Sequence, residues 1–189
     1  MNKIILASGS PRRKMLLEWA EVDFEVLSKY TDENYPPGLP VEQVPLYIAK
    51  NKALAVASTL PSGRKNILVA ADTVVVLDGE IIGKPVDQRD AINILTRLSG
   101  RVHRVITGVV IYNETREISF ADSTEVEFYE LTPEQIIFYV EKYKPYDKAG
   151  AYAIQEWIGV VGIKNISGDF YNVMGLPVSR VVKALQQFE

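Results

Sequence analysis

The fold is decided around residues 67–77, which read ILVAADTVVVL. The run is apolar and rich in β-branched residues, so it predicts a buried β-strand. The pair Asp78-Gly79 that follows favours a tight turn, and residues 80–82 then return as a second strand. One charged residue, Asp72, interrupts the first strand. This strand is therefore predicted to lie in the core and to carry one unusual carboxylate.

The segments on either side alternate between helical and strand periodicity. Upstream, we predict strands at 3–7 and 24–27, a loop at 31–40, a helix at 41–59, and a helix from Pro11 to about Ala20 whose buried face holds Met15, Leu16 and Trp19. Downstream, we predict a helix from Asp87 to Gly100, paired strands at 102–112 and 118–129, a helix from Thr132 to about Pro145, a strand at 160–163 and a helix from Pro177. This order predicts an α/β fold with a mixed sheet.

Composition limits the class of protein. With 189 residues and 47% hydrophobic content, residues 1–189 are expected to form one domain, and a bilobal form stays open. The absence of cysteine excludes disulfides and thiolate chemistry and fits a cytoplasmic location. No stretch approaches the roughly 20 apolar residues of a membrane span. A net charge of -3 argues against a general nucleic-acid binder, so any anion site must be local.

The segment Ser8-Gly9-Ser10-Pro11-Arg12-Arg13 follows directly on a predicted strand. It combines a turn glycine, a capping serine and a first-turn proline with two arginines in the first helical turn. Cations there oppose the helix dipole, whereas a bound phosphate would satisfy both the free N–H groups and the guanidinium groups. The pattern therefore indicates an anion site, and a capped helix with solvated arginines is the alternative. A Walker A loop is excluded because its glycine-lysine pattern is missing.

Asp72 needs a reason for its burial, because an isolated buried carboxylate is costly. It is expected to hold a metal, to pair with Lys52 or Lys84, or to lie where the strand ends in a cleft; capping a neighbouring element is the structural alternative. Glu33, in an acidic loop, is a second possible oxygen ligand, since magnesium takes one or two carboxylates plus phosphates and water. His103 is the only histidine, which disfavours a multi-histidine metal site. We expect its role to be structural, although a single histidine can act as a base.

Taken together, these segments resemble the Maf family of nucleotide pyrophosphatases along nearly the whole chain. The match preserves order and spacing over Ser8–Arg13, Asp32-Glu33, Lys50–Ala53, Ala71–Val75, Gly83–Pro85, Leu98–Gly108, Asp147–Gln155 and Asn172–Pro177. A difference follows Gln155, where Glu156-Trp157 replaces the glycine-containing stretch of many relatives.

The resemblance implies an elongated α/β fold with a mixed sheet, flanking helices and a central cleft, similar to inosine triphosphate pyrophosphatases. It implies hydrolysis of dTTP and UTP, and of modified pyrimidine nucleotides, to the monophosphate and pyrophosphate. Asp72 matches the proton acceptor of the family. The residues Arg12, Thr73 and Gln155 match positions tied to substrate choice. A glutamine amide offers both an acceptor and a donor, which suits the N3–H and carbonyl of uracil or thymine.

The resemblance also implies roles for the remaining residues. Glu33 and Asp72 are expected to hold a divalent cation, Mg²⁺ or Mn²⁺, and the substrate-binding side chains are expected to be Ser8, Ser10, Arg12, Arg13, Lys52, Thr73, Lys84 and Gln155. No nucleic-acid or membrane partner is expected, and a homodimer stays open. Two other functions remain: a nucleotide-binding regulator of septum formation without turnover, and a pyrophosphatase acting on 7-methyl-GTP.

Overall fold

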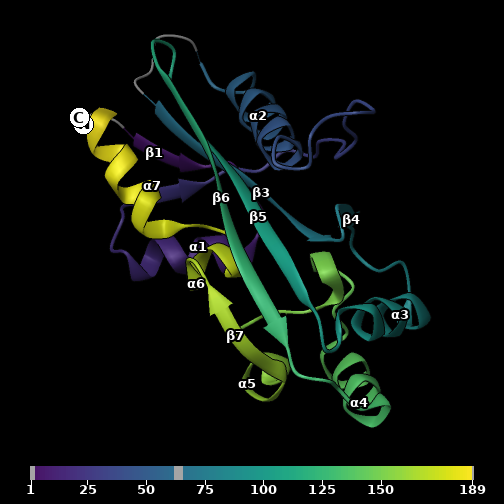
Figure 1. Cartoon of the computed structure of the whole chain (residues 1–189). Coiled ribbons are helices and arrows are strands. Elements are labelled where there is room, and N and C mark those ends of the chain that lie inside the picture. Colours follow the sequence, from purple (N-terminus) through teal and green to yellow (C-terminus); the bar gives the residue numbers. More distant parts are fainter. Residues whose placement is uncertain (1–2, 62–65, 189) are drawn as a thin grey trace. The chain divides into compact units, whose positions relative to one another are not determined.

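A computed structural model of the chain describes residues 3–61 and 66–188. Within that part, seven strands form a sheet in the order β2-β1-β3-β5-β6-β7, and β4 pairs with β3 (Figure 1). The strands are β1 (Lys3–Leu6), β2 (Phe24–Val26), β3 (Asn66–Leu77), β4 (Glu80–Ile82), β5 (Val102–Tyr112), β6 (Glu117–Phe128) and β7 (Ile163–Ser167). The α-helices are α1 (Pro11–Trp19), α2 (Val44–Ala57), α3 (Gln88–Leu98), α4 (Pro133–Tyr143), α5 (Trp157–Gly162), α6 (Phe170–Met174) and α7 (Val178–Leu185). Two short 3₁₀ helices are η1 (Ala149–Ala151) and η2 (Gln186–Phe188).

The sheet is mixed. Strand β1 runs parallel to both β2 and β3, whereas β4 is antiparallel to β3 and β7 is antiparallel to β6. The connection between β5 and β6 is closed by a hydrogen bond of 2.9 Å from Asn113 N to Arg116 O, and Figure 1 shows these two long strands as a pair. The α/β fold with a mixed sheet and helices is thus confirmed.

The chain divides into two compact units. Unit 1 comprises Met1–Asp72, Thr107–Asp122 and Gly175–Glu189, and unit 2 comprises Thr73–Ile106 and Ser123–Met174. Strands β3, β5 and β6 each contribute residues to both units, so the division falls inside continuous strands. In β3 it falls between Asp72 and Thr73.

The core of unit 1 forms where α2 packs on the first strands of the sheet. Its small residues Ala49 and Ala53 are buried with Val56 against a cluster that includes Ile5 of β1 and Leu68 of β3. Small side chains on the helix allow a close approach to the strands. Gly108 shows how close that approach is, because a Cβ there would lie 2.4 Å from Leu46 N. Since α2 carries Lys52, this packing fixes the helix that delivers the lysine.

Local signals at two helix starts in unit 2 are confirmed. Asp87 is the N-cap of α3, and its Oδ1 accepts a hydrogen bond of 2.8 Å from Asp90 N. At α4 the Thr132 hydroxyl accepts from Gln135 N at 3.3 Å, while Gln135 Oε1 accepts from Thr132 N at 2.9 Å. This is a complete capping box, which satisfies two N–H groups that the helix leaves without partners.

The strand predicted at 160–163 is wrong. Residues Trp157–Gly162 form α5, and β7 begins only at Ile163. The β-branched Val160 and Val161 favour a strand locally, but tertiary packing overrides that preference. Gly159 turns so tightly that a Cβ would lie 1.7 Å from Ile154 O. Any side chain at position 159 would therefore clash with this carbonyl oxygen.

Smaller corrections concern α1 and α2. Trp19 is 61% exposed, and the buried residues of α1 are Arg13, Leu16 and Leu17, so only Leu16 of the predicted face is buried. Helix α2 begins at Val44 rather than at position 41, because residues 41–43 form a turn ahead of Pro45 in the first helical turn. Within residues 3–61 and 66–188, no helix is long and apolar enough to cross a membrane.

Candidate functional site

Asp72 and Glu33 both form ion pairs with the same cation, Lys52. Asp72 is 7% exposed in β3, and its Oδ1 lies 2.7 Å from Lys52 Nζ. The same ammonium lies 2.7 Å from Glu33 Oε1. Lys52 comes from α2, Glu33 from the loop after β2, and Asp72 from the middle of β3, so three separate segments of unit 1 converge. The pairing removes the penalty of burying Asp72 alone.

The loop that carries Glu33 is shaped by its neighbour. Asp32 Oδ1 accepts from Asn34 N at 3.0 Å, and Asp32 Oδ2 accepts from Asn34 Nδ2 at 2.6 Å. Such a local turn uses the Asp32 carboxylate to replace missing backbone partners. Asp32 therefore serves the loop itself, and Glu33 is the carboxylate that reaches Lys52. On α2, Lys50 pairs instead with Glu117 at 3.2 Å.

The Ser8–Arg13 segment forms a closed hydrogen-bonded turn at the start of α1. Ser8 Oγ accepts from Ser10 N at 3.2 Å and from Arg13 Nη1 at 3.2 Å. Arg13 Nε donates to Gly175 O at 2.8 Å. Ser10 is the N-cap, but among the described residues its side chain makes no capping bond, so the predicted capping serine is wrong in that detail. The backbone N–H of Ser10 is used by Ser8 instead.

Arg13 is a buried cation near both carboxylates. Arg13 is 8% exposed, and burial lowers the pKa of its guanidinium group. The charge of Asp72 raises the pKa of Arg13, that of Arg12 lowers it and that of Glu33 raises it. An arginine stays protonated despite such shifts. A second positive charge therefore accompanies Lys52 in this part of unit 1.

Three further predicted residues, Thr73, Lys84 and Gln155, belong to unit 2. Thr73 follows Asp72 in β3 and is half-buried, while Lys84 and Gln155 are exposed. The segments carrying the last two are adjacent, because Gly150 N donates to Gly83 O at 3.1 Å. Gly150 also packs on β3, where a Cβ at this position would lie 2.8 Å from Val75 Cγ2.

The segment before Gln155 is held by a network that the sequence did not reveal. The buried hydroxyl of Tyr139, on α4, accepts a hydrogen bond of 3.1 Å from Ala153 N. The same hydroxyl donates to Glu156 Oε2. Lys148 Nζ lies 3.7 Å from Glu156 Oε1 and 2.8 Å from Asp147 Oδ1. A buried tyrosine needs a partner for its hydroxyl, which is the one available sequence signal, since position 139 falls between Ile136 and Val140 on the helix.

His103 lies in an aromatic cluster of unit 2. Its Nε2 is 2.8 Å from the Tyr152 hydroxyl, and its ring packs edge-on against Phe128 and Tyr152 with centroids 5.2 and 5.5 Å away. Burial lowers the pKa of His103 to about 4, and burial also raises the pKa of Tyr152. His103 is thus neutral near pH 7, and this packing fits the structural role that we expect for it.

The carboxylates fit a divalent cation only with help from a ligand. Within residues 3–61 and 66–188, no group of three or more His, Cys, Asp or Glu side chains could hold a metal by itself. Glu33 and Asp72 nevertheless direct one oxygen each to a common point, at present the Lys52 ammonium. Magnesium characteristically binds through one or two carboxylates and completes its shell with water and phosphate oxygens. The donor set is therefore of the type that holds a cation together with a phosphorylated substrate.

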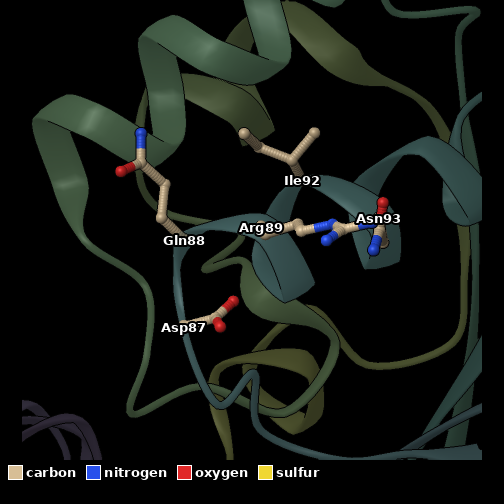
Figure 2. Close-up of a pocket in the computed structure, with 5 residues that line it drawn as sticks. All are labelled: Asp87, Gln88, Arg89, Ile92 and Asn93. Atoms are coloured by element: carbon tan, nitrogen blue, oxygen red, sulfur yellow. The ribbon is translucent and has the colours of Figure 1, made fainter.

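Unit 2 contains a pocket at the start of α3 whose acidic lining residue, Asp87, is engaged in capping that helix. Figure 2 shows it at the start of α3, where its lining residues are Asp87, Gln88, Arg89, Ile92 and Asn93. Asp87 is occupied as the helix cap, and Asp90 Oδ2 accepts from Val86 N at 3.0 Å. None of the nucleotide-binding residues predicted from the sequence lines this pocket.

Comparisons with known proteins point to one family. Residues 3–188 match the family described as Maf-like protein. The chain is 50% identical over 184 residues to a Cytophaga hutchinsonii protein named dTTP/UTP pyrophosphatase, covering 97% of this chain and 83% of that one. It is 48% identical over 187 residues to a Porphyromonas gingivalis protein of the same name, covering 98% and 94%. The solved structure of the Staphylococcus aureus Ham1 protein aligns with a TM-score of 0.52 at 15% identity, over 98% of both chains, and that likeness shows the fold alone.

Proposed function

Because this chain belongs to the Maf-like protein family, we propose that it hydrolyses dTTP and UTP to the nucleoside monophosphate and pyrophosphate. Relatives that carry the name dTTP/UTP pyrophosphatase match it at 46–50% identity over nearly its whole length. The observation that carries the proposal is the convergence of Asp72 and Glu33 on Lys52, at 2.7 Å each, with the buried Arg13 in electrostatic range. Two carboxylates among cations are suited to a polyanionic substrate and its counter-ion.

The cations are proposed to neutralise the triphosphate. Lys52, Arg12 and Lys84 act as binding charges, and the Ser8 and Ser10 segment supplies contacts at the start of α1, where N–H groups favour an anion. Arg13 acts mainly through its charge and through the turn that it holds, because two of its nitrogens donate to Ser8 and Gly175. Thr73 and Gln155 are proposed to determine which base is accepted.

Asp72 is the proposed proton acceptor. Water attacks the α-phosphorus, the bond from that phosphorus to the oxygen bridging the α- and β-phosphates breaks, and pyrophosphate leaves. The Asp72 carboxylate orients the water and accepts its proton. Glu33 and Asp72 would hold Mg²⁺ or Mn²⁺, which when bound supplies positive charge to the phosphate oxygens. Lys52 pairs with both carboxylates and holds them in place before substrate binds.

The test is pyrophosphate release from dTTP, UTP, CTP, GTP and 7-methyl-GTP, with Mg²⁺ or Mn²⁺ and with chelator. Asp72→Asn is nearly isosteric and is expected to lower turnover by about 10²- to 10⁴-fold while the fold survives. Asp78→Asn is the matched control: Asp78 lies in the turn after β3, pairs with Arg101 at the surface, and has a left-handed φ of 53° that asparagine accepts. It is expected to keep full activity.

Each other outcome has a definite meaning. Wild-type-like turnover in Asp72→Asn would refute the role of Asp72. Release from 7-methyl-GTP but not from UTP would assign the chain to that other substrate. Nucleotide binding without any release, unchanged by added magnesium, would favour a regulatory protein.

A further inference from the structure

Gln155 cannot by itself distinguish uracil from cytosine. Its side-chain amide carries an acceptor and a donor that exchange places when the amide rotates by half a turn. One orientation matches the N3–H and O4 of uracil, and the other matches the N3 and N4–H₂ of cytosine. A preference for dTTP and UTP over cytidine nucleotides therefore needs a group whose donors and acceptors are fixed. Backbone N–H and C=O groups meet that requirement, provided that their segment is rigid.

The segment that carries Gln155 is held on its inner side. Residues 151–154 are buried and Gln155 is exposed, so the exposed residue stands on an immobilised base. Tyr139 accepts from Ala153 N at 3.1 Å, and Glu156 N donates to Ala153 O at 3.1 Å. Both backbone groups of Ala153, two residues before Gln155, are therefore engaged.

The polarity of this network is set by charge. Glu156, when ionised, can only accept, so the Tyr139 hydroxyl donates to Glu156 and keeps its lone pairs for the Ala153 N–H. Lys148 is 9% exposed and places its ammonium 3.7 Å from Glu156 Oε1, while Glu156 Oε2 accepts from Tyr139. Lys148 thus pairs with Glu156, Glu156 orients the Tyr139 hydroxyl, and that hydroxyl holds Ala153 N.

The backbone entering the segment is strained, which indicates that its path is imposed. Gly150 and Ala151 have φ values of 70° and 57°, and alanine rarely adopts the left-handed region. Such a conformation persists only where the surroundings enforce it and is often associated with functional sites. On the other side, Gly159 presses against Ile154 O, where a Cβ would come within 1.7 Å.

We infer that Tyr139 and Glu156, supported by Lys148, are positioning residues that hold the Gln155 backbone and thereby set the preference for uracil and thymine over cytosine. The inference rests on the proposed function, because it deepens the account of base selection by Gln155. It also gives a role to Glu156, the residue that follows Gln155. Neither Tyr139 nor Glu156 takes part in the chemical step.

The test is the ratio of kcat/KM for UTP to that for CTP in wild type, Tyr139→Phe, Glu156→Ala and Glu156→Gln. Tyr139→Phe and Glu156→Ala are expected to lower the ratio by about tenfold or more, through a higher KM for UTP with little change in kcat. Glu156→Gln keeps an acceptor for Tyr139 and is expected to restore most of the ratio. Hydrogen exchange at the Ala153 amide is expected to accelerate in Tyr139→Phe.

Tyr143→Phe is the matched control. Tyr143 stacks on Tyr139 with ring centroids 4.9 Å apart, and its hydroxyl makes no hydrogen bond to the residues that the structure describes. Its removal is expected to leave the ratio unchanged. Ratios within about twofold of wild type in Tyr139→Phe and Glu156→Ala would overturn the inference, as would a wild type that does not discriminate UTP from CTP. If Tyr139→Phe fails to fold, the Glu156 pair decides. A wild type that releases no pyrophosphate from UTP refutes the proposed function instead.

Discussion

The burial of His103 predicts a loss of stability in mild acid. Burial lowers the pKa of this histidine to about 4, whereas an unfolded chain keeps it near 6.5. Between about pH 4 and pH 6.5 the unfolded state therefore binds more protons than the folded state. The contribution of neutral His103 to the free energy of unfolding is fully present above about pH 6.5 and declines as the pH falls towards 4. Linkage between these two values gives a loss of about 2 kcal/mol on going from roughly pH 7.5 to roughly pH 5.

The assay is urea unfolding at both pH values, for wild type and for His103→Phe. Phenylalanine keeps an aromatic ring beside Phe128 but cannot titrate, and it removes the partner of the Tyr152 hydroxyl. That loss lowers stability equally at both pH values, by about 1 to 3 kcal/mol. The two stability curves are expected to converge in acid, because only the wild type loses the additional 2 kcal/mol or so. Parallel curves would refute the assignment of a neutral buried histidine.

Three further predictions concern packing, capping and charge. Gly108→Ala places a Cβ 2.4 Å from the Pro45 carbonyl carbon and is expected to cost about 1 to 3 kcal/mol in urea unfolding, with no effect at all contradicting the close packing of α2. Thr132→Ala removes the capping box of α4 and is expected to cost about 1 kcal/mol by thermal unfolding, a value near zero being inconsistent with that cap. Lys52→Met leaves Asp72 buried without its bridging ammonium and is expected to cost about 3 kcal/mol; the added change Asp72→Asn should recover most of it, and a failure to do so would mean that the ion pair is not the cause.

Much of the fold was accessible from the sequence because its signals are local. A helix cap such as Asp87 or Thr132 depends on residues within three positions, and the strand at 67–77 is recognisable from its own composition. Pairing of Asp72 with a cation could be anticipated for a different reason, because an isolated buried carboxylate is costly, and Lys52 was one of the two lysines considered.

The sequence predictions fail where contacts between residues far apart in the chain determine the local structure. Val160 and Val161 favour a strand by their residue type, yet they lie in α5, where Gly159 packs closely on Ile154 O. The contact between Tyr139 and Glu156 joins α4 to the residue that precedes α5, so neither neighbourhood in the sequence reveals it.

The division of the chain into two units also has a consequence for biosynthesis. Synthesis of unit 1 starts before that of unit 2 and ends after it, because residues 175–189 follow every residue of unit 2. Arg13 emerges from the ribosome early, but the Gly175 carbonyl that binds its guanidinium is made 162 positions later. The Arg13 guanidinium therefore lacks this hydrogen-bond acceptor while all of unit 2 is translated. A ribosome that stalls before Gly175 would carry a chain with every residue of unit 2 but without the last segment of unit 1.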